Sequence, residues 1–539
     1  MKFSRPLLAL VLLVIVLVAV WLWWSIPAKV DMADYAPADA VVYVEFNNPA
    51  AVVQAIQNSN VWQAAAPITQ TKAAPSSRFS TAAARAGLGP LPAVLFARAQ
   101  VALAMIGMNT FEEDNALKVR PEFALIVETH TSKWRIKPAA AAAIKQLANF
   151  SYGDSMCSER TADADYIECS VAGGERKIIG AVDGSLVVIG NSDNAVRSCL
   201  DAHHGRRPNI HSDPELVKVR ANVSSDKTLG FGYVSPANSA KLFSWVAPLM
   251  ILQSPGDQQL QQLLAVSAGK VLRGVAWTAS SAPQGIEDRF LFSLDPGVVS
   301  RLQPAFAESE PDLGFWQFVP EGFQSVTIYR NKTPATAWSS LSSAVAFKLD
   351  AVPAALFGTL LKSSLSVYGI SNPKEALTAL NPPLLTLKPS EGAAEAILVA
   401  RVNDAERLKQ SLSNSEEFTA VFVNDYVLLG KTENVRASLA AIKKGVESDP
   451  NKYLNYLGDT GVIMTFTNDE DRVNNFLSTL VQLQGRKLSP QELESLHNVV
   501  RTAGISATET KLNAFGIERR TRSAFGQFST LTSLLQSGR

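Results

Sequence analysis

The first strong pattern along the chain is an apolar segment with no polar residue in it. Leu7 to Trp24 is an unbroken run of eighteen apolar residues. As a helix that rises about 1.5 Å per residue, the run reaches about 27 Å, close to the ~30 Å hydrocarbon core of a bilayer. Its far end carries three tryptophans, whose rings favour the membrane–water boundary. We therefore predict a transmembrane anchor over residues 7–27, through which the chain contacts the membrane.

The charges before this run predict its orientation. Lys2 and Arg5 place the short segment 1–6 in the cytoplasm, so a single-pass protein of the cell inner membrane would hold its bulk in the periplasm or outside the cell. A cleaved signal peptide, which would release a soluble secreted protein, is the alternative. Signal peptides have an apolar region of 7–15 residues before a small-residue cleavage site, and this run is longer and ends in tryptophans. We expect the anchor to remain uncleaved.

Beyond the anchor, the same order of predicted elements occurs twice. An alternating strand, a polar turn with proline and a helix follow Pro37, and the same series follows Pro320. The clearest match pairs DGSLVVIGNSDNAVRSCL, which begins at Asp183, with NDYVLLGKTENVRASL, which begins at Asn424. Each half also closes with a predicted hairpin that contains Gly-Ile-Glu. We interpret the chain as a tandem duplication.

These matches predict the domain organisation and the fold class. The strands are linked by hairpins and alternate in polarity, whereas a doubly wound parallel sheet would show continuous apolar strands that alternate strictly with helices. We expect an α+β fold in which helices cover one side of a largely antiparallel sheet. The predicted parts after the anchor are a linker (28–35), a first α+β copy (36–298), a connector (299–313), a second α+β copy (314–534) and a C-terminal tail (535–539).

Composition and charge narrow the class of partner. Apolar residues make up 47% of the chain, enough to bury a substantial core, and 539 residues suggest two to four domains. The formal charge of +1 supplies no field that would attract a polyanion, so we predict no nucleic-acid partner. A protein or another component of the envelope is the expected partner.

The three cysteines offer one candidate disulfide. Cys157 and Cys169 lie in a predicted hairpin whose turn falls near Ala162 to Ala164, so the two residues can face each other across the strands. In an oxidising compartment they can form a disulfide, and buried free thiols are the equally weighted alternative. A zinc site built on these thiols is not expected, because no C-x2-C spacing is present.

Two of the elements described above resemble a bacterial family. The opening element Pro37 to Ala50 has the pattern P-A-D-x-x-x-Y-V-x-F-x-x-P-A, and Asp183 to Arg197 has the pattern D-G-x-L-V-x-x-G-x-x-x-x-A-V-R. In these patterns and in its anchor the chain resembles an uncharacterised family of anchored envelope proteins, known only as a domain of unknown function. The second half departs at Gly322 and Asn434. The resemblance implies an extracytoplasmic repeat protein and supplies no catalytic residue.

One short motif could support catalysis. Ser224-Ser225-Asp226-Lys227 matches S-x-x-K, in which the lysine lies one helical turn after a serine nucleophile and helps to activate it. The segment is polar, has no K-T-G partner and precedes a predicted strand. We therefore expect a solvated turn and keep an envelope hydrolase with Ser224 and Lys227 as the alternative function.

The sequence offers only weak candidates for metal and nucleotide sites, and we predict neither. His203, His204 and His211 near Asp213 could bind a transition metal, but two arginines interrupt them, so a basic helix end is the simpler interpretation. Turns are expected at three further polar segments, Gly173-Gly174, Asp163 with Asp165, and Glu112 to Asp114. Core packing is expected of four tryptophans, Trp62, Trp134, Trp316 and Trp338, with a ligand groove as the alternative.

The sequence thus predicts a membrane-anchored, extracytoplasmic binding or scaffold protein that is not an enzyme. We predict no catalytic residues, no cofactor and no metal ion. The groove between the two copies is the expected place for a ligand.

Overall fold

The computed structural model describes most of the chain after the predicted anchor. The described residues are 29–68, 99–113, 116–153, 155–171, 176–236, 238, 270–283, 285–310, 314–320, 322–389, 396–443, 453, 457, 461–483 and 488–530. The predicted anchor, residues 7–27, lies outside them, as does the predicted tail, 535–539. Among the described helices, none combines the length and the apolar character that crossing a membrane requires.

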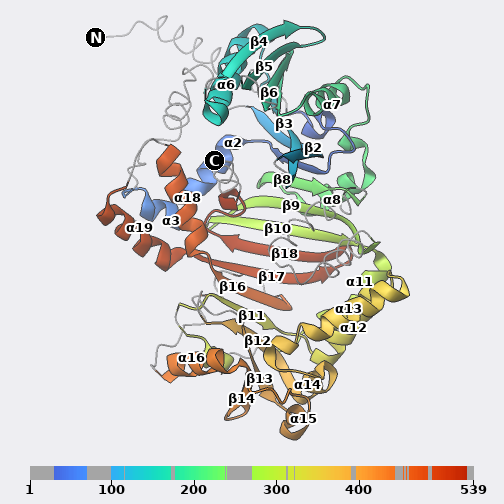
Figure 1. Cartoon of the computed structure of the whole chain (residues 1–539), viewed down its shortest axis with the longest axis vertical. Coiled ribbons are helices and arrows are strands. Elements are labelled where there is room, and N and C mark those ends of the chain that lie inside the picture. The colour runs from blue at the N-terminus through green and yellow to red at the C-terminus, as the bar shows by residue number, and fades with distance from the viewer. Residues whose placement is uncertain are drawn as a thin grey trace, which may run out of the picture.

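The described residues form one sheet of 18 strands, and the registered strand pairs are all antiparallel. Following the pairs from one edge to the other, the order is β4-β5-β6-β7-β3-β2-β1-β8-β9-β10-β18-β17-β16-β11-β12-β13-β15-β14. The sheet runs the length of the molecule, with β10 and β18 side by side near its middle (Figure 1). The predicted mixed fold with a large antiparallel sheet is confirmed.

The first half of the chain supplies the strands from β4 to β10. Their bounds are β1 Val42–Phe46, β2 Gln100–Glu113, β3 Ala116–Glu128, β4 Ser155–Thr161, β5 Asp165–Val171, β6 Lys177–Asp183, β7 Leu186–Gly190, β8 Thr228–Val234, β9 Leu272–Ala282 and β10 Gly285–Leu294. The helical segments of this half are η1 Met32–Tyr35, α2 Pro49–Gln57, α3 Asn60–Ala65, α6 Lys133–Tyr152, α7 Asp193–His203, η2 Ile210–Ser212, α8 Pro214–Val223 and α11 Pro296–Leu302.

The second half supplies the remaining strands. They are β11 Ser325–Tyr329, β12 Leu380–Lys388, β13 Ile397–Val402, β14 Phe418–Val423, β15 Tyr426–Lys431, β16 Ile463–Asn468, β17 Ile505–Asn513 and β18 Gly516–Ser523. Its helical segments, with the one that joins the halves, are η4 Gln303–Phe306, η5 Gly314–Phe318, α12 Pro334–Ala346, α13 Ala351–Ser363, η6 Ser366–Tyr368, α14 Pro373–Ala379, α15 Ala405–Gln410, α16 Thr432–Lys443, α18 Glu470–Leu483 and α19 Pro490–Ala503. The two closing hairpins predicted from sequence are confirmed as β9–β10 and β17–β18.

Helices cover both faces of the sheet, which corrects the expectation of one covered side. On β3, Ile126 packs in a core with α7 and α8, while its neighbour Val127 packs against α6. In the second half, Leu428 of β15 packs with η5 and α16, and Val427 packs with α14 and α15. Because successive side chains of a strand point to opposite faces, two buried faces require continuous apolar strands. The runs LVVIG and YVLLG have this character.

The two halves interlock through more than one element. Strands β10 and β18 pair over Ile286–Ser293 and Gly516–Ser523. Helix α3 of the first half packs with α18 and α19 of the second half in a separate apolar core that also contains Phe525. The β10–β18 pairing and this core join the two halves of the chain.

Two segments predicted as linkers are packed elements. The predicted linker 28–35 contains η1, in which Met32 and Ala33 are fully buried. The predicted connector 299–313 contains the end of α11 and all of η4, whose Ala305 is also buried. The burial of both segments depends on partners that are distant in the chain.

Candidate functional site

The candidate catalytic pair lies in an exposed turn. Ser224 is the C-cap of α8, where its backbone N–H donates to the Arg220 carbonyl at 2.9 Å, and Lys227 lies in the turn before β8. The Ser225 N–H closes this turn by donating to Thr228 Oγ1 at 2.8 Å. Since Ser224 and Lys227 do not lie on one helix, the spacing S-x-x-K does not produce here the geometry that the motif needs.

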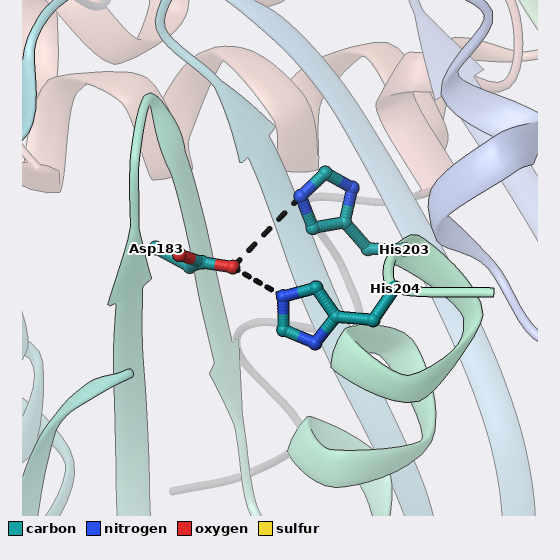
Figure 2. A group of neighbouring side chains, drawn as sticks. All are labelled: Asp183, His203 and His204. Carbon is teal, nitrogen blue, oxygen red and sulfur yellow. Dashed lines mark hydrogen bonds and ion pairs between the residues drawn. The ribbon is translucent and has the colours of Figure 1, made fainter. Parts of the chain in front are cut away.

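Side chains that are able to bind a metal gather at a different place. Asp183 ends β6, His203 is the last residue of α7, and His204 is the C-cap of that helix. His204 Nε2 lies 2.7 Å from Asp183 Oδ2, and His203 Nε2 lies 3.8 Å from the same oxygen. Figure 2 shows both imidazoles directed at this carboxylate.

The lengths of two elements bring this cluster together. Strand β7 has 5 residues and α7 has 11, so at about 3.3 Å and 1.5 Å per residue both extend roughly 16 Å. The helix therefore returns to the level at which β7 begins, next to the β6–β7 turn. Gly190 lets it approach closely, because an added Cβ there would lie 2.9 Å from a methyl group of Val196.

A buried residue pair supports one of the two imidazoles. The Tyr35 ring lies 5.0 Å from the His203 ring, between centroids, and the Tyr35 hydroxyl donates to Glu128 Oε2 at 3.3 Å. The Glu128 side chain is buried and also accepts from the His130 N–H at 2.7 Å. Partial burial lowers the pKa of His203, a direction that the neighbouring His204 reinforces and Asp183 opposes.

The structure separates residues that the sequence grouped with these histidines. His211 Nδ1 lies 2.8 Å from Asp31 Oδ2, away from the cluster. Asp213 caps α8 by accepting from the Glu215 N–H, and it accepts from the Tyr233 hydroxyl at 2.9 Å. Of the four residues considered together from the sequence, only His203 and His204 lie close to each other, and the sequence analysis did not include their partner Asp183. The lengths of β7 and α7, had they been estimated from the sequence, would have predicted that Asp183 lies beside the end of α7.

A buried charge network on the same half was also missed. Arg220 binds both carboxylate oxygens of Asp31 through Nη1 and donates to Glu45 Oε2 through Nη2 at 2.8 Å. The Tyr43 hydroxyl donates to the same Glu45 oxygen at 2.6 Å. Burial raises the pKa of Glu45, whereas the Ala33 N–H and Arg220 outweigh partial burial and lower the pKa of Asp31. Because Asp31 caps η1, this network fastens the start of the described chain to the first half.

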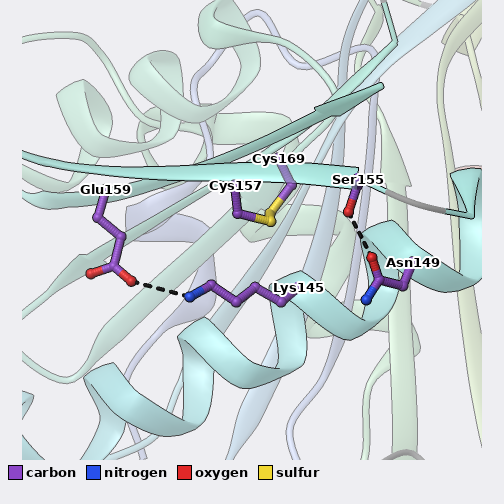
Figure 3. The surroundings of a disulfide bond; sticks show 6 residues. All are labelled: Lys145, Asn149, Ser155, Cys157, Glu159 and Cys169. Atoms are coloured by element: carbon purple, nitrogen blue, oxygen red, sulfur yellow. Dashed lines mark hydrogen bonds and ion pairs between the residues drawn. A yellow bond between two sulfur atoms is a disulfide. The ribbon is translucent and has the colours of Figure 1, made fainter. Parts of the chain in front are cut away.

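The candidate disulfide lies near the outer edge of the sheet. Cys157 and Cys169 are register partners on β4 and β5, with sulfur atoms 2.10 Å apart and Cα atoms 4.1 Å apart. Figure 3 shows the bond above α6, flanked by the Lys145–Glu159 ion pair and by the hydrogen bond from Ser155 to Asn149. The predicted hairpin turn, 162–164, is confirmed. The third cysteine, Cys199, is free and buried, and burial raises the pKa of its thiol to about 12.

The other candidate polar segments bind protein groups or lie outside the described residues. Asp163 accepts from Tyr166 and Arg206, and Asp165 accepts from Thr161 and pairs with two lysines. Cations therefore already neutralise both carboxylates. Gly173-Gly174 and Asp114 are outside the described residues, and the side chains of Glu112 and Glu113 are not described.

The tryptophans divide between core and surface. Trp316 is buried and stacks on Tyr453 at 5.4 Å, as core packing predicts. Trp62 and Trp338 pack against the edges of apolar cores. Trp134, by contrast, is 71% exposed, with the Arg135 guanidinium over its ring. A shallow groove between α18 and α19, lined in part by Leu493 and His497, contains none of these tryptophans.

No family model matches the sequence, and neither a curated protein nor a solved structure is significantly similar to it. The resemblance to an envelope family therefore stays a prediction. Asp183, His203 and His204 are a group of described side chains that could hold a metal ion.

Proposed function

We propose that the chain is a non-catalytic binding or scaffold protein, anchored in the cell inner membrane by residues 7–27 and exposed on the extracytoplasmic side. The observation that carries this proposal is the docking of η1, which begins at Met32, a short distance after the predicted anchor. Met32 and Ala33 are fully buried, and Arg220 holds the preceding Asp31. An N-terminal helix in the bilayer would thus be joined firmly to the folded body.

The few residues between the predicted anchor and η1 limit how far the folded body can lie from the membrane. Five peptide steps separate residue 27 from Met32 and span less than about 20 Å even when fully extended. The face of the first half that carries η1 would therefore lie close to the membrane surface. Such a protein is suited to binding a component of the envelope near the bilayer.

The cysteine pair supports the extracytoplasmic side. Disulfides persist in oxidising compartments and are rare in the cytosol. Cys157 and Cys169 are at bonding distance, while the only other cysteine of the sequence, Cys199, is buried in a core. This is the arrangement expected of a domain exported before its thiols oxidise.

We further infer that the two halves are tandem copies of one α+β unit. Omitting β4 and β5, the pairing order β6-β7-β3-β2-β1-β8-β9-β10 corresponds to β14-β15-β13-β12-β11-β16-β17-β18. Aligning Gly-Ile-Glu at Gly285 and Gly516 also aligns Arg289 with Arg520, and these two arginines face each other in the β10–β18 register. Self-pairing of equivalent residues is typical of a two-fold related interface.

A labelling experiment in intact cells tests the anchored topology. A variant without native cysteines and with Met156→Cys carries its only thiol at a position whose side chain is 66% exposed. A membrane-impermeant thiol reagent, applied after permeabilisation of any outer membrane, should label it in the membrane fraction. The control is a variant without native cysteines and with Ser4→Cys, which should be labelled only after lysis. Labelling of Met156→Cys only after lysis would contradict the extracytoplasmic assignment, and recovery in the soluble fraction with a shortened N-terminus would favour the secreted alternative.

The hydrolase alternative has a direct test. Because Ser224 lies in an exposed turn, we expect an acylating serine probe to react equally with the wild type and with Ser224→Ala. Labelling that disappears in Ser224→Ala and in Lys227→Ala would overturn the non-catalytic assignment.

A separate experiment addresses the bound component. Crosslinking in intact membranes followed by mass spectrometry would identify it.

A further inference from the structure

We propose that Asp183, His203 and His204 form a Zn²⁺ site with three protein ligands and one coordination position left for water. The carboxylate oxygen and the two imidazole nitrogens lie within 4.8 Å of one another. Two imidazoles and a carboxylate are suitable Zn²⁺ ligands, and three protein ligands with water make up a common four-coordinate set.

The distances are close to those that a bound ion requires. Ligand atoms at 2.0–2.2 Å from a tetrahedral Zn²⁺ are roughly 3.3 Å from one another. Asp183 Oδ2 is 2.7 Å from His204 Nε2 and 3.8 Å from His203 Nε2. Moving each imidazole by about half an ångström relative to the carboxylate would bring both nitrogens to this distance from the oxygen. The two nitrogens, which lie within 4.8 Å of each other, would approach through the same side-chain torsions.

The backbone at this place allows neighbouring histidines to converge. In a continuous helix, side chains that are adjacent in sequence point about 100° apart. His204 is the C-cap, at which α7 ends, and its ring centroid lies 5.2 Å from that of His203. Both rings therefore approach one carboxylate from the end of a single helix, as Figure 2 shows.

The site is both supported from behind and open to solvent. Tyr35, held by buried Glu128, packs on the His203 ring and limits its rotation. The side chains of His203, His204 and Asp183 remain 32%, 27% and 24% exposed, so an ion can enter without local unfolding. Groups that orient a ligating histidine typically strengthen metal binding.

The second half has different residues at the matching places. Val423 precedes Gly430 by seven residues, as Asp183 precedes Gly190. Gly184 and Asn424, which follow Asp183 and Val423, have φ values of 58° and 54°, so the two turns are alike. Aligning Val435-Arg436 with Val196-Arg197 places Ile442 and Lys443 at the positions of His203 and His204. Neither valine nor isoleucine can ligate Zn²⁺, and the site is thus particular to the first half.

Metal titration of the purified full-length protein in detergent tests the proposal. After removal of bound ions with a chelator, Zn²⁺ should bind with one high-affinity equivalent per chain in isothermal titration calorimetry, and it should raise the melting temperature. His204→Gln, His203→Gln and Asp183→Asn should each weaken Zn²⁺ binding by at least about 100-fold. His211→Gln, which changes a histidine bound to Asp31, is the matched control and should bind Zn²⁺ as the wild type does.

Several outcomes would overturn the site. These are absence of the high-affinity equivalent in the wild type, unchanged affinity in the three ligand variants, or loss of binding in His211→Gln alone. Equal affinity for Mg²⁺, which prefers oxygen ligands, would also contradict a site built on imidazoles. Circular dichroism of each metal-free variant establishes that it is folded. If one of the three ligand variants does not fold, the other two still test the site.

Discussion

The two halves of the sheet share an order of strand pairing but are stabilised in different ways. The first half inserts the 20-residue helix α6 and the disulfide-linked β4–β5 hairpin between β3 and β6, where the second half has only the six-residue α15 between β13 and β14. In the second half, Trp316 stacks on Tyr453 and packs against Phe466. The added hairpin of the first half lies at the outer edge of the sheet, where it leaves the central pairing unchanged.

The largest expected effect comes from the aromatic core of the second half. Trp316→Ala should lower the free energy of unfolding by about 3–5 kcal/mol, because it leaves a cavity beside Tyr453 and Phe466. Hydrogen exchange should show faster opening of β11 and β16 than of β6 and β7. Trp316→Phe is the control: it keeps a stacked ring and removes an indole N–H that has no hydrogen-bond partner in the described part of the chain. A loss below 1 kcal/mol in Trp316→Ala would show that this core is not what stabilises the second half.

The disulfide should have the next largest effect, confined to the first half. Replacing both Cys157 and Cys169 with alanine should destabilise the β4–β5 hairpin by about 3 kcal/mol, since the bond closes a loop of 12 residues in the unfolded chain. Hydrogen exchange of residues 155–171 measures this loss. A reducing agent should reproduce it in the wild type and have no effect on the double variant. Equal destabilisation of β13 and β15 would contradict independent stabilisation of the halves.

A matched pair of glutamates tests the central junction. Glu518 accepts two hydrogen bonds from Arg289, at 2.8 and 2.9 Å, one from Arg520 and one from Asn513 at 3.0 Å, whereas the aligned Glu287 accepts one from Arg522 at 2.7 Å. We expect Glu518→Gln to cost about 2 kcal/mol and Glu287→Gln about half of that, because only the first leaves Arg289 and Arg520 facing each other without the charge between them. Denaturant midpoints of the two variants give the comparison, and equal losses would contradict it.

A buried carboxyl beside the junction predicts a small pH dependence. Asp288 accepts from the Trp277 indole N–H and the Gln527 N–H, and burial raises its pKa to about 6 from an ordinary 3.8. Between these values the folded state binds the proton more tightly than the unfolded state, so the contribution of this group to stability grows as the pH falls. From pH 7 to pH 5 the gain is about 1 kcal/mol. The contribution of Asp288 is measured from the free energies of unfolding of the wild type and of Asp288→Asn at both pH values. If the difference in free energy between the two proteins were the same at pH 5 and pH 7, the predicted contribution would be ruled out.

Local elements of the fold were predictable, whereas their distant partners were not. Periodicity and turn residues predict both closing hairpins and the turn at residues 162–164, since these depend on neighbouring residues alone. The pairing of Arg522 with Glu287 joins positions 235 residues apart, and the hydrogen bond from Arg220 to Asp31, which caps η1, joins positions 189 residues apart. No local pattern specifies such partners. The Asp183–His204 contact is intermediate in predictability, because the lengths of β7 and α7 predict it once both elements are known.

The position of β18 between β10 and β17 has a consequence for biosynthesis. This strand is the last of the described chain, yet it fills the middle of the sheet. A nascent polypeptide must therefore expose the edge of β10 until its final hairpin leaves the ribosome, and a premature stop before Gly516 would leave that edge unpaired. Since unpaired strand edges promote aggregation, truncated chains should be insoluble even though every residue of the first half has been synthesised.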